Sequence, residues 1–412
     1  MRAVVYRGVN HLRLETVPVP RIGPNELLVK VAVCGVCPTD IKKIHYGTVP
    51  PPRIFGHETA GTIVKIGSRN SSLVTRHSSL KVGDRVALHH HIPCMKCHFC
   101  RHRSFAQCET YKRTGITAGF EPAGGGYAEY VRVMDFVLPG VVKIPARNSF
   151  EEGAMLEPVN TVLKAVKRLN LLRGDRVLVA GQGPIGLMFT KILQLRGINV
   201  LATDLLESRL KLAGQFGAER AVLASQLSTL NPQLDCAIIA VPSDAAVTQA
   251  LQLVRGGGQI LLFAHTKRAD GRWQMADGAS PSILPNSQLP SPISQMDFAS
   301  ICLDEKDLIG SYSSDFTLQD EVARLVFSRR LDVRSLITHR FPLDQTSDAI
   351  ALAARPTPDS LKILVSTDYA LQEYGLTPGE MAAAEKRISA DIKSARAHGE
   401  LTPFTGSKND FR

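Results

Sequence analysis

Hydrophobic and polar residues alternate over short runs through the first 155 or so positions of the chain. Glycine- and proline-containing turns separate these runs, a pattern typical of β-strands with one buried face. The runs are Leu27–Val33, Thr59–Ile66, Arg85–His91 and Ala128–Val133. This part of the chain is therefore predicted to form a small β-barrel.

The pattern changes near Leu156, where short apolar runs begin to alternate with helical stretches. Such alternation is typical of a parallel sheet built from βαβ units, whose strands are buried on both faces. The apolar runs are Val177–Ala180, Val200–Thr203, Cys236–Ala240 and Gln259–Phe263. The fold class is therefore predicted to be α/β, with a β-rich domain followed by a doubly wound one.

Four further segments are interpreted from their composition. Arg69–Leu80 is predicted to be a surface loop, and the Pro/Ser-rich stretch Thr266–Phe298, which holds the only tryptophan, a mobile loop or insertion. Ser311–Thr367 returns to mixed α/β sequence with a strand at Lys362–Val365. Thr377 is predicted to cap a helix that runs to about Ala397, before a loose polar end.

At 412 residues the chain is long enough for two domains. The net charge of +11 is concentrated in the first 150 residues. Nucleic-acid binding is not favoured, because these basic residues are scattered without helical clustering or interleaved aromatic residues. Steering of an anionic dinucleotide or substrate, or pairing with another subunit, explains them better. No signal peptide or membrane-spanning run is evident, so a cytoplasmic protein is expected.

The sharpest local pattern is a set of four closely spaced cysteines, Cys94, Cys97, Cys100 and Cys108. Four thiolates close a tetrahedral shell and leave no open position for a substrate, so a structural zinc site is predicted. An iron–sulfur cluster is the rival interpretation, since it also takes thiolate ligands. The ion is predicted to hold a lobe, about residues 90–113, that has little core of its own.

A second candidate metal site combines Cys37, His57 and Glu58. A thiolate, an imidazole and a carboxylate form the mixed ligand set of an open, catalytic zinc. Thr39 follows two residues after the cysteine, where its hydroxyl is placed to pass a proton. Taken alone, these residues fit better with a small buried cysteine and a core histidine, and the later motifs reverse that preference.

Gly181-x-Gly183-Pro184-Ile185-Gly186 follows an apolar strand and opens a helix, the context of a dinucleotide-binding turn. The backbone there is predicted to cradle a pyrophosphate at the helix N-terminus. Asp204 ends the next strand, where a carboxylate accepts from ribose hydroxyls and repels a 2′-phosphate, so NAD is favoured over NADP. Asp204 as a helix N-cap is the alternative, and Arg209 could meet a phosphate or stack near the adenosine.

These motifs occur in the order seen in the zinc-dependent medium-chain dehydrogenases, which the chain resembles from about Met1 to Val365. The resemblance is greatest to the sorbitol (polyol) and threonine dehydrogenase branches. It rests on Cys37–Asp40, Gly56-His57-Glu58, the four cysteines, Gly125–Val131, Leu156-Glu157-Pro158 and Gly181–Gly186.

The resemblance implies a GroES-like catalytic domain over 1–157, a Rossmann domain over 158–300, a return to the catalytic domain over 301–368 and a helical tail over 369–412. It implies that Cys37 and His57 bind the catalytic zinc, with Glu58 or Glu157 as ligand or close neighbour. Thr161 would back the nicotinamide, and Thr39 would accept the alcohol proton. With the four-cysteine lobe, the expected cofactors are two zinc ions per chain and NAD.

Two features depart from a simple reading of the family pattern. Many relatives carry histidine five residues after the ligand cysteine as a proton relay; here that residue is Lys42, and His45 is the candidate substitute. His89-His90-His91 cannot all bind one ion if they lie in a strand, because alternate side chains face opposite sides. His91 is expected near the substrate, with the other two as fillers.

The leading function is oxidation of a secondary alcohol on a polyol, sugar or cyclitol to a ketone by NAD. A threonine-type amino-alcohol dehydrogenase is the alternative enzyme, and a non-catalytic, zinc-stabilised dinucleotide-binding protein is the alternative of another class. The resemblance further implies a homo-oligomer formed through the edge of the Rossmann sheet. The scattered basic residues and the lack of a long apolar run predict no nucleic-acid or membrane partner.

Overall fold

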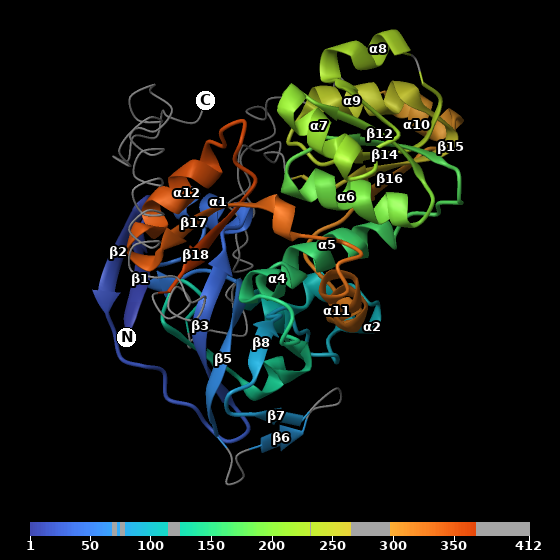
Figure 1. The fold of residues 1–412 in the computed structure, drawn as a ribbon. Coiled ribbons are helices and arrows are strands. Elements are labelled where there is room, and N and C mark those ends of the chain that lie inside the picture. The colour runs from blue at the N-terminus through green and yellow to red at the C-terminus, as the bar shows by residue number, and fades with distance from the viewer. Residues whose placement is uncertain (68–71, 75–78, 114–123, 231, 265–296, 368–412) are drawn as a thin grey trace, which may run out of the picture. The chain divides into compact units, whose positions relative to one another are not determined.

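The computed structural model describes residues 1–67, 72–74, 79–113, 124–230, 232–264 and 297–367. These residues divide into two compact units, one from 1–157 with 319–367 and the other from 158–264 with 297–318. Figure 1 colours the chain from its start to its end. Three sequence predictions lie outside the described residues: the insertion at 266–296, the helix from Thr377 to Ala397, and the tail 369–412.

In the first unit, the described strands form one large and two small sheets. The large sheet has the order β10-β8-β5-β3-β18-β17, with β9 also paired to β3. Its strands are β3 (Leu27–Gly35), β5 (Glu58–Ile66), β8 (Arg85–Leu88), β9 (Tyr130–Val133), β10 (Val141–Lys143), β17 (Ile337–Pro342) and β18 (Lys362–Ser366). The small sheets are β2-β1-β4, from β1 (Arg2–Gly8), β2 (His11–Thr16) and β4 (Arg53–Ile54), and the pair β6 (Ser72–Val74) and β7 (Ser79–Lys81).

The strand β3 organises this unit because it pairs with β5, β9 and β18. Its residues are almost all buried, as expected of a strand with neighbours on both edges. The antiparallel pair of β3 and β18 joins the start of the chain to residues 362–366. The first unit therefore depends on both ends of the described chain.

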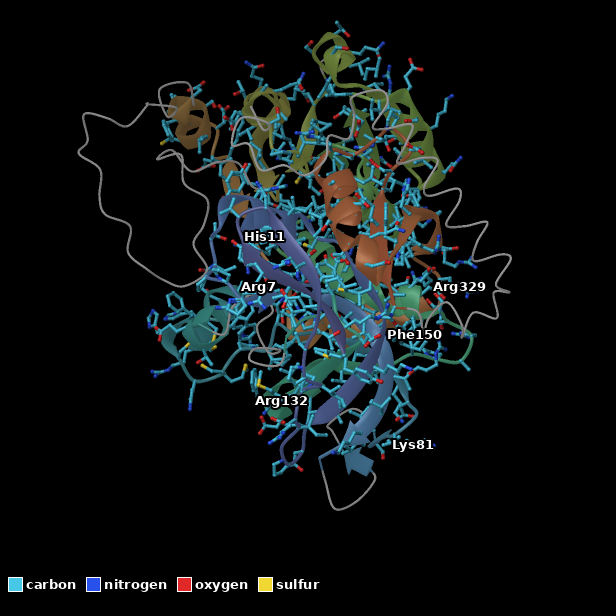
Figure 2. The ribbon with its side chains drawn as sticks, turned by 90° about the vertical axis from the view of Figure 1, so that its left-hand side faces the viewer. Arg7, His11, Lys81, Arg132, Phe150 and Arg329 are labelled. Atoms are coloured by element: carbon cyan, nitrogen blue, oxygen red, sulfur yellow. The ribbon has the colours of Figure 1, made fainter. Side chains whose placement is uncertain are left out.

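The described helices of the first unit are all short. They are α1 (Pro38–Tyr46), α2 (His98–Arg101), α3 (Glu109–Arg113), α4 (Phe150–Ala154), α11 (Gln319–Phe327) and α12 (Thr346–Ala354). Helix α4 begins with a capping box between Ser149 and Glu152. Phe150 on this helix, labelled in Figure 2, is buried, and the Arg85 guanidinium lies over its ring at 4.3 Å.

The second unit is a six-stranded parallel sheet over the described residues, in the order β13-β12-β11-β14-β15-β16. Its strands are β11 (Arg176–Ala180), β12 (Asn199–Asp204), β13 (Arg220–Leu223), β14 (Leu234–Ile239), β15 (Val254–Leu262) and β16 (Asp307–Gly310). Its helices are α6 (Pro184–Leu195), α7 (Glu207–Gln215), α8 (Leu227–Leu230), α9 (Asp244–Leu253) and α10 (Phe298–Leu303), while α5 (Leu156–Val166) begins at the division between the units. The strand order reverses between β11 and β14, as in a doubly wound nucleotide-binding sheet.

Sheet pairing corrects four predicted boundaries. β8 ends at Leu88, so the three histidines lie beyond the strand, and β9 begins at Tyr130 rather than Ala128. Part of the predicted loop 69–80 is the antiparallel hairpin β6–β7. The chain returns to the first unit at Gln319 rather than at residue 301, because β16 still pairs with β15 in the parallel sheet.

Among the described residues, no helix combines the length and the apolar character needed to span a bilayer.

Candidate catalytic and cofactor sites

Cys37, His57 and Glu58 converge in the first unit, with their ligand atoms all within 4.8 Å of one another. Cys37 precedes α1, which begins with Pro38 and ends at Gly47. His57 and Glu58 lead into β5 just after Gly56, whose φ of 97° is unfavourable for other residues. A side chain at Gly56 would also meet the Cys34 Sγ at 2.7 Å. The turn at Gly56 therefore sets the position of both ligands.

Asp40 holds the His57 imidazole in a fixed orientation. The Asp40 side chain is fully buried, and its Oδ1 lies 3.1 Å from His57 Nδ1. The hydroxyl of Tyr127 lies 3.4 Å from Asp40 Oδ2. Burial lowers the pKa of His57, but the Asp40 carboxylate and the Cys37 thiolate outweigh this effect and raise it overall. With Nδ1 engaged, Nε2 is the ring nitrogen left for a metal ion, an arrangement common among ligand histidines.

Glu58 forms a buried ion pair with Lys362 of β18. Lys362 Nζ also donates to the carbonyl of Val36 at 2.9 Å. Burial raises the pKa of Glu58, and the nearby Glu157 adds to that shift while Lys362 opposes it. Burial lowers the pKa of Lys362, but Glu58 and Cys37 reverse the effect and raise it. A Cβ at Gly35 would lie only 1.8 Å from Glu58 Oε2, so Gly35 makes room for the carboxylate.

Replacing Lys362 with methionine is expected to destabilise the first unit by about 3–5 kcal/mol, because the Glu58 carboxylate would stay buried without its cation. The double variant Glu58→Gln/Lys362→Met should recover much of that loss, since no unpaired charge remains. Urea unfolding of both variants measures the effect. A loss below about 1 kcal/mol in Lys362→Met, as for an exposed pair, would contradict the buried ion pair.

Glu157 does not belong to the convergent triplet and instead faces His91. Its Oε1 lies 3.6 Å from His91 Nδ1, and both side chains are largely buried. Burial raises the pKa of Glu157, but hydrogen bonding to His91 and the charge of His57 together lower it to about 2. The negative charge of Glu157 also contributes to the raised pKa of Glu58. Of the two carboxylates, Glu58 is the one grouped with Cys37 and His57.

The histidines after β8 form a stack beside His57. The His90 ring centroid lies 4.9 Å from that of His57 and 4.1 Å from that of His91, and the His91 ring contacts the edge of Tyr111 at 4.4 Å. Burial lowers the pKa of His89 to about 3 and that of His90 well below its usual value, so both imidazoles are neutral. The alternation argument fails for them, since the strand has already ended.

The predicted proton-relay residues lie on α1. Thr39 is half-buried. His45 Nδ1 lies 2.5 Å from Asn10 Oδ1, and burial lowers the His45 pKa to about 4. Burial lowers the pKa of Lys42 to about 8, while the Cys37 thiolate opposes the shift. His45 is thus a neutral imidazole in contact with Asn10. On the same helix, the negative charge of Cys37 partly offsets the effect of burial on the pKa of Lys42.

The four lobe cysteines form a second convergent cluster, with all four sulfurs within 4.8 Å of one another. None is in a disulfide. The backbone N–H of Lys96 donates to Cys94, which lowers the pKa of that thiol to about 6, whereas burial raises the pKa of Cys100 to about 12. Met95 has a φ of 60°, which bends the chain between the first two cysteines. Four sulfurs at this spacing fit a closed tetrahedral zinc site.

In the second unit, the glycine turn has the backbone that a pyrophosphate requires. Gly181 has a φ of 93°, and a Cβ at Gly186 would lie 1.7 Å from the Gly181 carbonyl oxygen. Gly183 is the N-cap of α6, and Pro184 is its first residue, with Ile185 next. The exposed N–H groups of this helix end therefore offer a cradle for an anion.

The Asp204 carboxylate accepts a hydrogen bond from the backbone of the same turn. Its Oδ2 accepts from the Gln182 N–H at 2.6 Å, and its Oδ1 accepts from the Leu206 N–H at 3.0 Å. The N-cap of α7 is Leu206, so Asp204 is not that helix's cap. Each carboxylate oxygen keeps a lone pair that can accept from a ribose hydroxyl. These contacts fit a dinucleotide.

The two other predicted cofactor residues have different surroundings. Arg209 of α7 lies beside the turn, since a Cβ on Gly183 would be 3.8 Å from Arg209 Nη1. The hydroxyl of Thr161 donates to the Pro158 carbonyl of its own helix at 2.8 Å. Arg209 is therefore placed to influence a phosphate, while Thr161 already has one partner.

Sequence reasoning missed three residues that shape the sites: Asp40, Lys362 and Gln182. Asp40 follows Cys37 by three positions, a spacing that brings both to one face of a helix. Lys362 is a cation in an otherwise apolar strand, and such a buried charge signals a partner. Gln182 carried no comparable signal; its side chain donates to the Val179 carbonyl and accepts from Thr190, both at 3.0 Å.

Comparison with known proteins gives matches along most of the chain. Residues 23–146 match the family model of the alcohol dehydrogenase GroES-like domain, and residues 184–278 match that of the zinc-binding dehydrogenase. A sorbitol dehydrogenase of Bombyx mori is 29% identical over 380 residues, covering 88% of this chain and 97% of the relative. One from Bacillus subtilis is 28% identical over 384 residues, covering 89% and 97%.

Solved structures of dehydrogenases also match most of this chain. A zinc-binding dehydrogenase of Sinorhizobium meliloti bound to NADP is 26% identical and superposes with a TM-score of 0.72 over 89% of this chain and 98% of that one. An alcohol dehydrogenase of Thermus is 25% identical, with a TM-score of 0.69 over 89% and 100%. The predicted fold class, a GroES-like domain with a Rossmann domain, is thereby confirmed. By its family models, its fold and its sorbitol dehydrogenase relatives, the chain belongs to the zinc-dependent medium-chain dehydrogenase/reductase family.

Proposed function

We propose that this dehydrogenase oxidises a secondary alcohol on a polyol, sugar or cyclitol to a ketone, with NAD as hydride acceptor. The observation that carries the proposal is the convergence of Cys37, His57 and Glu58 within 4.8 Å, with Asp40 and Lys362 behind them. Relatives named sorbitol dehydrogenase, which cover nearly the whole chain, support the polyol class.

The protein's own residues prepare the site for this reaction. Zinc, when bound, supplies a Lewis acid that lowers the pKa of an alcohol hydroxyl. Asp40 orients His57 and favours its Nε2 as a ligand atom, and Lys362 offsets the charge of Glu58. Thr39 is proposed to accept the alcohol proton, because it follows the ligand cysteine by two residues and is half-buried rather than sealed in the core.

Assaying the zinc-loaded protein with NAD against sorbitol, inositol and threonine tests the function. NADH absorbance should rise with sorbitol or inositol and far less with threonine, and metal analysis should give two zinc ions per chain. Preference for threonine would favour the amino-alcohol alternative. One zinc ion per chain with no turnover of any alcohol would favour the non-catalytic alternative.

Replacing Asp204 with alanine is expected to lower the preference for NAD over NADP by at least about tenfold, because a carboxylate that accepts from ribose and repels a 2′-phosphate is lost. The ratio of kcat/KM for the two cofactors measures this. Glu207→Ala, an exposed change of the same charge three residues away, should leave the ratio nearly unchanged. Equal ratios for Asp204→Ala and the parent protein would contradict the role of Asp204.

A homo-oligomer formed through β16 is part of the proposal. Over the described residues β16 ends the sheet order, and apolar side chains near it are exposed, with Leu303 80% and Phe298 56% accessible. An edge strand beside exposed apolar residues favours pairing with a second copy. Light scattering should give a dimer or larger species for the parent protein and a smaller one for Leu303→Lys/Leu308→Lys.

A cytoplasmic location is also proposed. None of the eight cysteines forms a disulfide, as is usual in a reducing compartment. Fractionation of cells that produce the protein tests this directly.

A further inference from the structure

A cavity of about 580 Å³ lies in the first unit, between β10 and the α11 segment. Its walls include the apolar side chains of Leu325 and Phe327. Four cationic side chains also line it, Lys143, Arg147, Arg324 and Arg330, against the carboxylate of Glu321. Cavities of this volume accept small organic ligands. This one combines an apolar wall with a marked excess of positive charge.

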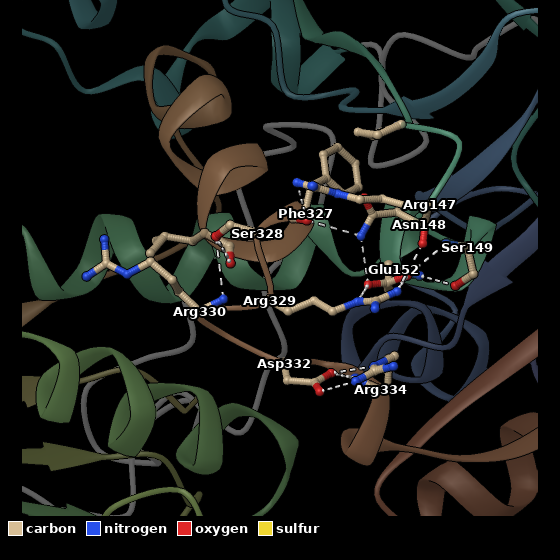
Figure 3. Close-up of polar contacts among 12 residues, drawn as sticks. Arg147, Asn148, Ser149, Glu152, Phe327, Ser328, Arg329, Arg330, Asp332 and Arg334 are labelled. Atoms are coloured by element: carbon tan, nitrogen blue, oxygen red, sulfur yellow. Dashed lines mark hydrogen bonds and ion pairs between the residues drawn. The ribbon is translucent and has the colours of Figure 1, made fainter.

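Arg329 and Arg330, just after α11, have different surroundings. Arg329 has a φ of 60°, and its side chain turns to Glu152, with Nε 2.9 Å from Oε1. Figure 3 shows the Arg330 side chain running away from Glu152. The carboxylate of Glu152 that Arg329 meets is buried. Arg329 therefore pairs with Glu152, while its neighbour Arg330 lines the cavity.

The lining cations differ in the partners that the structure gives them. Lys143 Nζ pairs with Asp84 at 2.7 Å, and Arg147 Nη2 donates to the Phe327 carbonyl at 3.3 Å. Within the described part of the chain, the guanidinium groups of Arg324 and Arg330 make no hydrogen bond or ion pair. Two other exposed arginines do have acidic partners, because Arg334 pairs with Asp332 and Arg7 with Glu15. The cavity thus holds guanidinium donors that protein groups do not use.

We propose that this cavity binds a phosphate-bearing small molecule, either a free phosphate anion or a nucleoside diphosphate. Guanidinium groups bind phosphate oxygens through paired, charge-assisted hydrogen bonds. Arg324 supplies these donors from α11 and Arg330 from the residues just after it, and Arg147 adds a third guanidinium from the segment after β10. The apolar wall accommodates a nucleoside. The cavity shares no residue with the glycine turn, and its occupancy does not depend on alcohol oxidation.

Calorimetric titration of the full zinc-loaded chain, with NAD present to occupy the glycine turn, tests the proposal. Inorganic phosphate and ADP are the two probes. Arg324→Gln/Arg330→Gln should weaken binding of at least one probe by about tenfold or more, since each guanidinium supplies charge-assisted hydrogen bonds. Tighter binding of ADP in the parent protein identifies a nucleotide ligand, and tighter binding of phosphate identifies the free anion.

The matched control is Arg7→Gln/Arg334→Gln, which removes two positive charges from exposed ion pairs outside the cavity. It should bind both probes as the parent protein does. The proposal is overturned if the parent protein binds neither probe, or if the control and the cavity variant lose affinity equally. Alcohol oxidation should be the same in all three proteins, so failure here is distinguishable from failure of the dehydrogenase assignment.

Discussion

Replacing Cys37 with serine is expected to remove one of two zinc ions per chain and to reduce alcohol oxidation by about a thousandfold. The thiolate of Cys37 is the soft ligand of the Cys37/His57/Glu58 cluster, and a serine hydroxyl does not ionise at neutral pH to replace it. Loss of the Lewis acid removes several kcal/mol of transition-state stabilisation, which corresponds to about three orders of magnitude in rate. Metal analysis and the NADH assay measure the two effects.

Cys34→Ser is the matched control, three residues away on β3. Burial raises the pKa of the Cys34 thiol to about 12, so it stays protonated and is a poor metal ligand. Its Sγ contacts the Gly35 carbonyl, a partner that a serine hydroxyl can keep. This variant should retain both zinc ions and most activity. A Cys37→Ser protein with two zinc ions and full activity would refute the assigned role of Cys37.

The second large effect concerns the lobe. Replacing Cys100 with serine is expected to release the other zinc ion and to lower the melting temperature by about 10 °C. Burial, with the neighbouring Cys97 and Cys108 thiols, raises the pKa of Cys100 to about 12, so a bound cation is needed to hold it as a thiolate. The apolar cluster around these cysteines is small, with Tyr111 and Phe105 as its main members. Metal binding therefore supplies much of the lobe's stability.

Cys236→Ser serves as the control for the lobe, because Cys236 is buried in β14 of the second unit. It removes a buried thiol without touching a metal ligand, so both zinc ions should remain. Scanning calorimetry measures the melting temperatures of the two variants, and metal analysis measures their zinc content. Retention of two zinc ions by Cys100→Ser would argue against a four-thiolate site.

The sequence was sufficient to predict the family, the fold class and most strands, because these depend on local patterns. The runs at 27–33 and 200–203 recur as β3 and β12, and the glycine turn precedes α6. Thiolate spacing is equally local, since the four lobe cysteines are close in the chain. Such features need no knowledge of distant contacts.

Long-range pairing could not be predicted in the same way. Lys362 reaches Glu58 only because β18 pairs with β3, which nothing in the local sequence around either residue indicates. The strand after Gly83 ended earlier than expected, so the histidines at 89–91 stack beside His57 and Glu157. The return at Gln319 likewise depends on β16 pairing with β15. In each case a non-local contact decided the outcome.

Anomalous diffraction at the zinc absorption edge, on crystals of the zinc-loaded protein, tests the central claim most directly. Two peaks per chain are expected, one among the four lobe sulfurs and one bonded to both Cys37 Sγ and His57 Nε2. A protein fully active with NAD and a polyol, but with no peak between Cys37 and His57, would contradict the account.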